Sequence, residues 1–431
     1  MTRSESEGIL GAIREEADRC IRCGFCEAAC PTFPAQGSSS YFGARGRMIL
    51  AKEIARTGDD ELTSLLRESQ EAFDTCLDCY ACFVECPVGL NPGKVSGLAR
   101  SLFESERNGE VSPNSISEFV TRSTIKYSNP LGLSSECREW AKPLDLPRDG
   151  EYLLFTGSMY QIMPYGSRLV ELAQRFGQSG PGRLASVGTH APFLIKFSKF
   201  LCDQDSRKRT EKILQSMVGL LRLSDVSFYY DEELEFYPGT YLHDLGFRSQ
   251  FKEYSTGVAK KFKEKGVRKI ITVDPHTYDL LKNVYPLYTD FPFEVVFYLD
   301  LLNLKLRKSE VKVTFHDPCR LSRHSSYIGR PRELINSAAT NVEPPRSRRR
   351  TMCCGGPDEL LYPGIAEKVS KAGYEELKKT GAEQILTACP VCLMNLGREG
   401  EVFDISEFLM SSVQEVVPAS SQKAPQAARK H

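Results

Sequence analysis

The residues of this chain that could carry chemistry are its cysteines. Eight of them form two runs with the same spacing, C-x2-C-x2-C-x3-C followed by proline, at residues 20–31 and 76–87. Thiolates at this spacing bind the irons of [4Fe–4S] clusters, and the fourth cysteine of each run ligates the other cluster in two-cluster proteins. The two runs therefore predict two clusters that share ligands between the runs.

This cross-over gives each predicted cluster a definite ligand set. A zinc knuckle is one alternative, but zinc is usually held by two separated pairs of ligands and would not need four cysteines in one short run. A disulfide framework is the other, and it is typical of small secreted chains, whereas this chain has 431 residues. The predicted sets are Cys20, Cys23, Cys26 and Cys86 for the first cluster, and Cys76, Cys79, Cys82 and Cys30 for the second.

A second group of thiols lies near the C-terminus, and each member follows or ends a predicted strand or its loop. Loops at the carboxyl ends of parallel strands gather at one edge of a sheet, so these thiols can converge. Gly355 and Gly356 would let the backbone turn closely around a bulky inorganic core. Spacing alone predicts a multi-thiolate metal site, and four thiolates around one zinc ion are an open alternative. The five cysteines are Cys319, Cys353, Cys354, Cys389 and Cys392.

The elements that must position these cysteines differ between the two parts of the chain. Residues 1–106 carry helix-like apolar spacing between the two runs and are predicted to form an all-helical two-cluster domain, followed by a connector at 107–150. After it, short apolar runs alternate with helical stretches such as 251–265 and 365–380, which predicts parallel α/β sheets. The predicted strands are 152–156, 226–230, 269–273, 294–299, 311–315, 384–387 and 402–405.

Composition narrows the class of protein. The chain is long enough for two or three domains that each bury a core. Lys+Arg and Asp+Glu both number 56, so no net charge favours nucleic acid as a partner. No apolar run approaches the length of a membrane span, and no secretory leader is evident. We expect a reducing, cytoplasmic location, with any membrane attachment made through a partner, and a disordered tail at 414–431.

The C-terminal cysteines resemble a known family. The string Cys-x33-Cys-Cys-Gly-x33-Cys-Pro-x-Cys, preceded by His316-Asp-Pro, is similar to the cysteine-rich CCG domain of heterodisulfide reductases and of the iron–sulfur subunits of glycolate, lactate and anaerobic glycerol-3-phosphate dehydrogenases. With the two cluster runs, the resemblance covers residues 15–410 and is greatest to the heterodisulfide reductase D subunit and the glycolate oxidase iron–sulfur subunit. It implies a non-cubane iron–sulfur cluster on the five C-terminal cysteines.

The same resemblance implies that the CCG-type α/β repeat occurs twice, at 151–308 and 309–413. In the first copy, Tyr237-Pro-Gly239 stands where Cys-Cys-Gly is expected, Asp274-Pro-His-Thr277 stands for Cys-Pro-x-Cys, and Ser158 stands for the leading Cys. Oxygen donors do not bind a soft iron–sulfur core, so the first repeat is expected to be degenerate. The predicted fold class is a multidomain α+β chain, a helical ferredoxin-type domain followed by these two repeats.

The resemblance also implies a function. No GxGxxG fingerprint stands in the required strand–turn–helix context, so flavin or nicotinamide would be held by a partner. We expect an electron-transfer subunit, not active alone, between a flavin-dependent 2-hydroxyacid dehydrogenase and a quinone, cytochrome or thiol/disulfide acceptor. A membrane quinone- or haem-binding subunit is a further expected partner. The alternative is a heterodisulfide reductase-like catalyst that reduces a disulfide at the CCG cluster.

Three groups of cationic or titratable residues close to the cysteines have two interpretations each. Arg45 and Arg47 either offset the negative charge of thiolate-ligated clusters or are solvated at a helix start. His316 and His324 flank Cys319, where they either donate to a cluster or are structural. The arginine-rich segment 346–350 is either a solvated loop or a binding surface for a substrate or partner.

Overall fold

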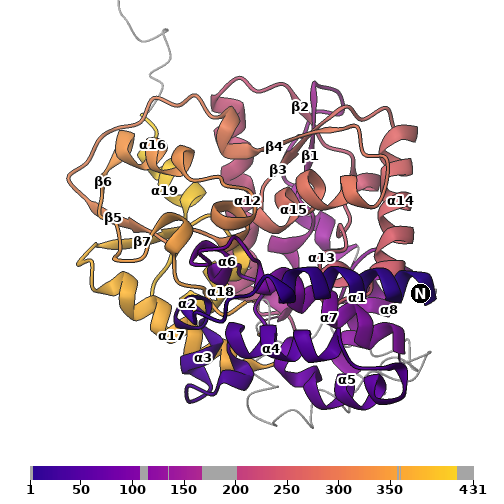
Figure 1. Ribbon diagram of the computed structural model, residues 1–431. Helices are drawn as coiled ribbons and strands as arrows, with labels where there is room; N and C mark the ends of the chain where they lie inside the picture. Colours follow the sequence, from indigo (N-terminus) through magenta and orange to yellow (C-terminus); the bar gives the residue numbers. More distant parts are fainter. Residues whose placement is uncertain are drawn as a thin grey trace, which may run out of the picture.

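The computed structural model of the protein describes residues 3–106, 115–133, 135–166, 201–356, 359 and 361–414. Figure 1 shows the N-terminal helices, in indigo and violet, along the lower front of the molecule, with one α/β layer at the upper right and the other at the left. The helical part therefore lies against both α/β parts. The predicted tail at 414–431 falls almost entirely outside the described residues.

The N-terminal part contains only helices among its described residues 3–106, as predicted. Four longer helices form its core: α1 (Arg3–Asp18), α4 (Ala44–Ile54), α5 (Asp59–Asp74) and α7 (Pro92–Glu106). Their apolar faces meet at side chains that are fully buried, such as Ile13, Ile54 and Phe73, and each such side chain contributes ~1.5–3 kcal/mol by leaving water. The short helices that follow the cysteine loops are α2 (Phe25–Ala28), α3 (Thr32–Ala35), η1 (Ser40–Phe42) and α6 (Ala81–Val84).

The connector is more structured than the sequence indicates. Its described part holds helix α8 (Ser115–Tyr127) and the 3-10 helix η2 (Glu136–Ala141). The side-chain oxygen of Asn129 accepts hydrogen bonds from the backbone N–H groups of Leu131 and Leu133, which fixes the turn between the two helices. Trp140 is buried and packs edge-on to Tyr230, so this segment is fastened to the first α/β layer.

The first α/β layer contains a four-stranded parallel sheet in the order β2-β1-β3-β4. Its strands are β1 (Tyr152–Phe155), β2 (Phe228–Tyr229), β3 (Lys269–Thr272) and β4 (Glu294–Phe297). Apolar runs without polar alternation are typical of parallel strands covered on both faces. Strand β3 fits this pattern, because its last three residues are all buried. The accompanying helical segments are α12 (Gln204–Leu223), η4 (Glu232–Leu234), α13 (Thr240–Asp244), α14 (Arg248–Glu264), α15 (Pro275–Asp279), η5 (Leu280–Val284), η6 (Tyr285–Leu287) and η7 (Tyr298–Leu301).

The second α/β layer repeats this strand order, with a parallel sheet β6-β5-β7-β8. Its strands are β5 (Lys312–Phe315), β6 (Thr340–Asn341), β7 (Gln384–Thr387) and β8 (Phe403–Asp404). All seven predicted strands are present, each within its predicted range, whereas the two-residue strand β6 is not predicted by the sequence. The helical segments are η8 (Arg320–His324), α16 (Gly329–Ala338), η9 (Arg348–Arg350), α17 (Pro363–Lys378), α18 (Pro390–Gly397) and α19 (Ile405–Ser412).

The two sheets share one hydrophobic core. Leu153 and Ile270 of the first sheet and Val313 and Leu386 of the second are all fully buried in it. The hydroxyl of Tyr160 donates to Asp404 at 2.6 Å across the two layers. The two sheets are therefore held at a fixed relative position, which matters for a site that takes residues from both.

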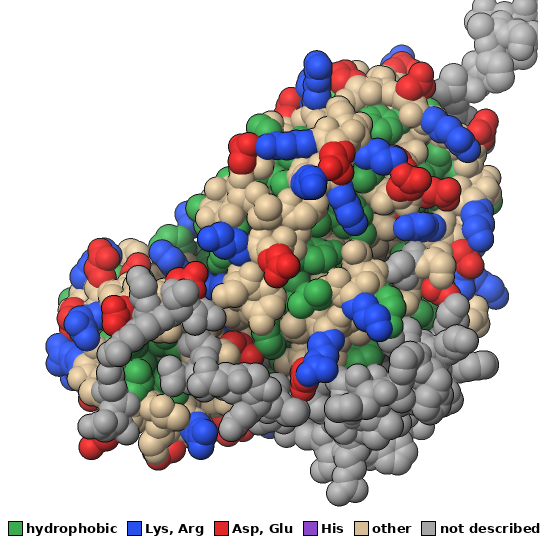
Figure 2. Space-filling view, turned by 90° about the vertical axis from the view of Figure 1, so that its right-hand side faces the viewer, with side chains coloured by type: hydrophobic (Ala, Val, Ile, Leu, Met, Phe, Trp, Pro, Cys, Tyr) green, Lys and Arg blue, Asp and Glu red, His purple; other side chains and the backbone are tan. Residues whose placement is uncertain are grey.

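The surface of one side of the molecule has no dominant charge. Figure 2 shows the side that carries α14, with Lys and Arg intermixed with Asp and Glu over its described part. No basic stripe of the kind that binds a phosphate backbone appears there. Among the described helices, none is both long and apolar enough for a membrane crossing.

Candidate metal centres

The first group of predicted ligands surrounds one cavity of the helical part. Cys20, Cys23, Cys26 and Cys86 all line it, so the fourth thiol comes from the second run, as the cross-over requires. Burial, followed by the neighbouring thiols, raises the pKa of Cys26 to about 12 in the ligand-free chain. The backbone N–H of Leu90 donates to the Cys86 sulfur at 3.3 Å.

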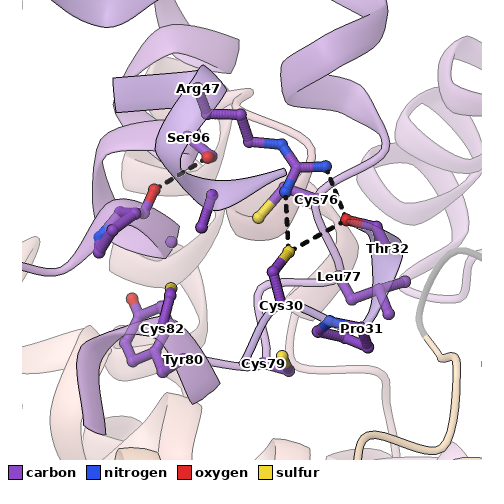
Figure 3. Close-up of a pocket in the computed structure, with 13 residues that line it drawn as sticks. Cys30, Pro31, Thr32, Arg47, Cys76, Leu77, Cys79, Tyr80, Cys82 and Ser96 are labelled. Carbon is purple, nitrogen blue, oxygen red and sulfur yellow. Dashed lines mark hydrogen bonds between the residues drawn. The ribbon is translucent and has the colours of Figure 1, made fainter. Parts of the chain in front are cut away.

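The second group surrounds a separate cavity, shown in Figure 3. Three of its thiols come from the second run and one from the first, again with the cross-over pattern. Cys30 stands at the end of the first run, and Pro31 leads from it into α3, whose first residue Thr32 also lines the cavity. The four thiols on the cavity wall are Cys30, Cys76, Cys79 and Cys82.

Both cysteine loops have the same unusual backbone. Arg22 and Gly24 in the first loop have φ of 58° and 90°, and Asp78 and Tyr80, at the equivalent positions of the second loop, have φ of 47° and 57°. Positive φ is costly for residues other than glycine and is retained where the surroundings require it. The repeated left-handed turns wrap each loop so that three thiols face one centre.

The two arginines have different surroundings, and the solvated interpretation is excluded for Arg47. Arg47 is fully buried, its Nη1 lies 3.6 Å from the Cys30 sulfur, and its Nη2 donates to Thr32 and Thr75. Burial alone would lower its pKa, but the thiols of Cys76 and Cys30 raise it, so the guanidinium stays charged. Arg45 lines the first cavity, and its Nε is buried without a hydrogen-bond partner among the described residues.

The third group of thiols lies at the carboxyl edge of the second sheet. Cys319 follows β5 and opens the π-helical turn η8, and Cys389 follows β7 at the start of α18. The ligand atoms of His316, Cys354 and Cys392 lie within 4.8 Å of one another. The parallel topology thus brings segments far apart in sequence to one place, as predicted.

Two histidines contact these thiols, and one of them comes from the first sheet. His316 interacts with Cys354, whose pKa is lowered well below its usual range by hydrogen bonds from Cys353, then Cys392, with a further contribution from His316. Burial alone would lower the pKa of His276, which follows β3, but the interaction with Cys389 raises it to about 9. Burial alone would raise the pKa of Cys389, but hydrogen bonds from Cys392 and His276 lower it to about 5.

The sequence did not identify His276 as a site residue. A signal was present, because Asp274-Pro-His-Thr277 aligns with Cys389-Pro-Val-Cys392, but the histidine itself carried no recognisable ligand spacing. His324, by contrast, does not belong to the thiol site. Its ring stacks on Tyr80 at 3.8 Å between centroids, and its Nε2 lies 2.9 Å from the backbone oxygen of Asp78.

The second and third groups of thiols are in direct contact. Cys353 and Cys79 are buried in the same cluster of side chains, and Cys319 packs against it. Arg323 donates to the backbone oxygens of Cys79 and Thr351, so the same turn fixes both segments. The two ligand sets therefore meet at this point.

Buried ion pairs hold this junction together. Arg320, on the π-helical turn η8, contacts Asp78 of the second cysteine loop at 2.8 Å and Asp279 of the first α/β layer at 3.1 Å. It also pairs with Asp244. We call these four residues, with His324, the junction latch. The latch joins the helical part to both α/β layers through one guanidinium.

The thiol sites suit anionic, sulfur-rich clusters. Thiolates are the soft ligands that iron–sulfur cores prefer. Beside the third site, Arg323 Nη2 and Asn395 Nδ2 are buried donors without partners among the described residues, and such donors would otherwise cost ~1–3 kcal/mol each. Gly355 has φ of 92°, and a β-carbon there would lie 2.4 Å from the oxygen of Ala366. A single zinc ion, held by His316 and three thiols, is a second occupant that this donor set permits.

Comparison with known proteins agrees with the two kinds of site. Residues 16–90 match the model of the 4Fe-4S dicluster domain, and residues 313–397 match that of the cysteine-rich domain. Both matches support iron–sulfur clusters in this chain. They also confirm the resemblance inferred from the cysteine spacing.

Several curated proteins are related over most of the chain. The chain is 24% identical to an EtfAB:quinone oxidoreductase of Syntrophomonas wolfei, over 93% of its own length and 58% of the relative's. It is 22% identical to the D subunit of the dihydromethanophenazine:CoB–CoM heterodisulfide reductase of Methanosarcina barkeri, over 90% and 91%. It is 24% identical to a probable glycolate oxidase iron–sulfur subunit of Bacillus subtilis, over 93% and 94%.

The lengths of the relatives differ from that of this chain. The chain spans 58%, 47% and 61% of the first three curated relatives that it matches. The heterodisulfide reductase and glycolate oxidase subunits are matched over nine tenths of their length. What is common to all these alignments is the combination of a dicluster segment with a cysteine-rich segment.

Proposed function

We propose that this protein is the electron-transfer subunit of an iron–sulfur oxidoreductase. The observation that carries this proposal is that Cys79 of the second thiol site and Cys353 of the third are buried in one cluster of packed side chains. Bound clusters would supply one-electron carriers at three sites in a row. The chain's own residues hold the clusters, offset their charge and exclude water around them.

Each site has its own proposed ligands. The first cluster is assigned to Cys20, Cys23, Cys26 and Cys86, and the second to Cys76, Cys79, Cys82 and Cys30, because these sets line two separate cavities. The third, non-cubane cluster is assigned to Cys319, Cys353, Cys354, Cys389 and Cys392. Arg47 places a permanent positive charge beside the second set, where a thiolate-ligated core is negative.

We further propose that residues 151–308 and 309–413 are two copies of one repeat, of which the first has lost its cluster. The identical strand order of the two sheets supports this relation. In the first copy, the positions of the missing ligands are occupied by Ser158, Asp274 and Thr277, all fully buried. The side chain of Asp274 accepts hydrogen bonds from the backbone N–H groups of His276 and Thr277, so it now caps α15 and orients His276.

The proposed partners follow from the names of the relatives. These include a quinone oxidoreductase linked by name to EtfAB and a glycolate oxidase subunit. We propose a flavoprotein dehydrogenase of the 2-hydroxyacid type as one partner, with a quinone- or haem-binding membrane subunit, a cytochrome or a thiol/disulfide compound on the other side. The proposed location is cytoplasmic, with membrane contact through that partner.

A second candidate function is disulfide reduction at the third site. The observation that favours it is the presence of groups able to hold protons beside the buried thiols. Burial raises the pKa of Glu359 to about 7, and Glu359 lies next to Gly356 in the loop that follows Cys354. Reduction of a disulfide to two thiols consumes two electrons and two protons, so a protonated carboxyl near neutral pH would be useful there.

Anaerobic purification with iron and sulfide quantitation, EPR spectroscopy and identification of co-purifying proteins tests the proposal. We expect three clusters per chain and a flavoprotein partner. Third-cluster EPR signals that change on addition of a thiol to the isolated chain would instead favour the disulfide catalyst. A chain that binds zinc and no iron at any of the three sites would contradict both functions.

A further inference from the structure

The part of the cluster row that reaches the surface is the first cysteine loop. Cys23 is exposed, whereas Cys319 of the third site is half-buried and Cys353, Cys354, Cys389 and Cys392 are buried. A protein that exchanges electrons with the row must approach a ligand near the surface. The first loop therefore marks the end of the row at which another protein would dock.

Two large apolar side chains project beside this exposed ligand. Phe25 is 60% exposed outside the first cavity, and Ile21, which also lines the rim of that cavity, is 62% exposed; they stand one on each side of Cys23 in the sequence. Large apolar residues are costly to leave in water, and a pair of them beside a functional loop indicates an interaction surface. They form the apolar centre of what we call the first-loop face.

Positive charge surrounds this centre. Arg19 and Arg22 are exposed on the first loop itself. Helix α2 packs against α6, and α6 packs against η9, whose residues Arg348, Arg349 and Arg350 are all exposed; Figure 1 shows α2 and α6 next to each other at the front of the molecule. The arginine-rich segment and the helix that follows the first loop thus both pack against α6.

Acidic side chains on this face do not cancel the charge. Glu85 is bound by Arg350 at 2.9 Å, and Glu16 lies 4.0 Å from Arg19. Glu27, within the loop, is buried. Neither Arg22 nor Arg349 forms an ion pair with an acidic side chain of the described residues, so the face keeps a surplus of positive charge.

We propose that the first-loop face is the docking surface for an acidic protein electron carrier. This inference rests on the proposed electron-transfer function and adds the location of the partner and the sign of its charge. Redox proteins meet through small, transient interfaces, and opposite charges around a small apolar centre raise their association rate. A carrier with an acidic face and a redox centre close to it fits both features.

The test uses the reconstituted holoprotein and an acidic plant-type [2Fe–2S] ferredoxin as the probe. Stopped-flow spectroscopy measures the second-order rate of cluster reduction by the reduced ferredoxin, and calorimetry measures the Kd with the oxidised ferredoxin. For Arg19→Glu/Arg349→Glu we expect about a tenfold or larger loss of rate and weaker binding. Rising salt should slow the wild-type reaction and have less effect on the variant.

Matched controls separate docking from damage to the clusters. Lys260→Glu reverses a charge on α14, away from this face, at a side chain that is 76% exposed, and should leave rate and Kd unchanged. Iron content and EPR spectra should be the same in all variants. Dithionite, a small reductant that needs no docking surface, should reduce the clusters of each variant to the same extent.

The outcomes distinguish the two proposals. Clusters that dithionite cannot reduce would contradict the electron-transfer function itself. Clusters that dithionite reduces, but whose reaction with ferredoxin is absent or equally fast in Arg19→Glu/Arg349→Glu and wild type, would overturn the docking surface alone. An equal loss in Lys260→Glu would also overturn it, because the effect would then be one of net charge.

Discussion

At the scale of single residues, the fourth cysteine of each run lies at a different cavity from the other three cysteines of that run. Proximity in sequence alone would place all four cysteines of a run together. Cys86 follows Cys82 closely in the chain, yet the two line different cavities. Pro87 stands after Cys86 as Pro31 stands after Cys30, and each fourth thiol is directed away from its own run. This geometry makes the ligand assignment testable one thiol at a time.

Replacing Cys86 and Cys82 separately tests the cross-over. Cys86→Ser should perturb the EPR signal of the cluster held by the first loop, and Cys82→Ser should perturb the other, because serine oxygen is a poor ligand for an iron–sulfur core. Each variant should lose up to one cluster's iron. Loss of the same signal in both variants would show that ligation does not cross over.

The adjacent pair Cys353 and Cys354 separates a cluster from zinc at the third site. Cys353 faces Cys79, whereas Cys354 faces Cys392 and His316. A multi-iron core is large enough to be bound by both thiols from opposite sides. A single tetrahedral zinc needs only four ligands and could leave one of the two thiols unused. Cys353→Ala and Cys354→Ala should each remove or transform the third EPR signal and spare the other two. A protein with one bound zinc that tolerates either substitution without loss of metal would contradict the cluster assignment.

At the scale of elements, the five-residue π-helical turn η8 contacts several segments that carry candidate ligands or the junction latch. It starts directly after Cys319, and its side chains reach the second cysteine loop and the first α/β layer. Single π-helical turns are uncommon in proteins, and those that do occur often lie at functional sites. The turn places Arg320, Arg323 and His324 on the junction between the second and third thiol sites.

Removing the guanidinium of Arg320 should destabilise this junction. Arg320→Met would leave Asp78, Asp244 and Asp279 buried without their partner, and breaking a buried pair in this way costs ~3–5 kcal/mol. We expect a large fall in the thermal unfolding midpoint, measured by circular dichroism on anaerobic holoprotein. The control Lys260→Met removes an exposed i,i+4 pair with Glu264 and should cost less than ~0.5 kcal/mol. An Arg320 variant as stable as this control would show that the latch does not hold the parts together.

The elements themselves were largely predictable, and their tertiary contacts were not. Seven strands were found because each is an apolar run bounded by turn residues, while Thr340–Asn341 is too short to show a pattern. Helix α8 is not predicted by the sequence because the segment 107–150 has few apolar pairs and several turn residues. The ion pair between Arg320 and Asp78 joins residues 242 positions apart, and no periodicity in sequence announces such a contact.

The residues of the candidate sites also differ in how far the sequence predicts them. The sequence predicts the cysteines as candidate ligands because metal ligands have characteristic spacing. The sequence leaves two interpretations for Arg47, and only burial decides between them. The sequence does not identify His276, because this residue follows the first sheet and acts on a thiol that follows the second. It does not identify Tyr80 either, because Tyr80 adopts a left-handed backbone that its residue type does not favour.

At the scale of the whole molecule, one α/β layer carries metal ligands and the other, in our proposal, has lost them. If this is right, Ser158→Ala and Thr277→Val should leave the iron content of the holoprotein unchanged. Thr277 Oγ1 is buried without a partner among the described residues, so its replacement by an isosteric apolar side chain should cost little stability. Inductively coupled plasma mass spectrometry gives the iron per chain. A loss equal to one cluster in either variant would mean that the first repeat still binds metal.

The first α/β layer nevertheless contributes to the third site through His276, and this contribution should be measurable as a potential. The interaction with Cys389 raises the pKa of His276, so His276 can donate to that sulfur. Hydrogen bonds to ligand sulfurs raise the potential of an iron–sulfur cluster because they stabilise its more negative, reduced state. We expect His276→Phe to lower the potential of the third cluster and leave the other two unchanged. A differential loss of ~1.4 kcal/mol corresponds to ~59 mV for a one-electron couple. His276→Gln, which retains an N–H donor, should restore part of the shift. EPR-monitored redox titration of wild type and the two variants at fixed pH provides the measurement. Equal potentials in wild type and His276→Phe would show that the two layers are not coupled through this contact.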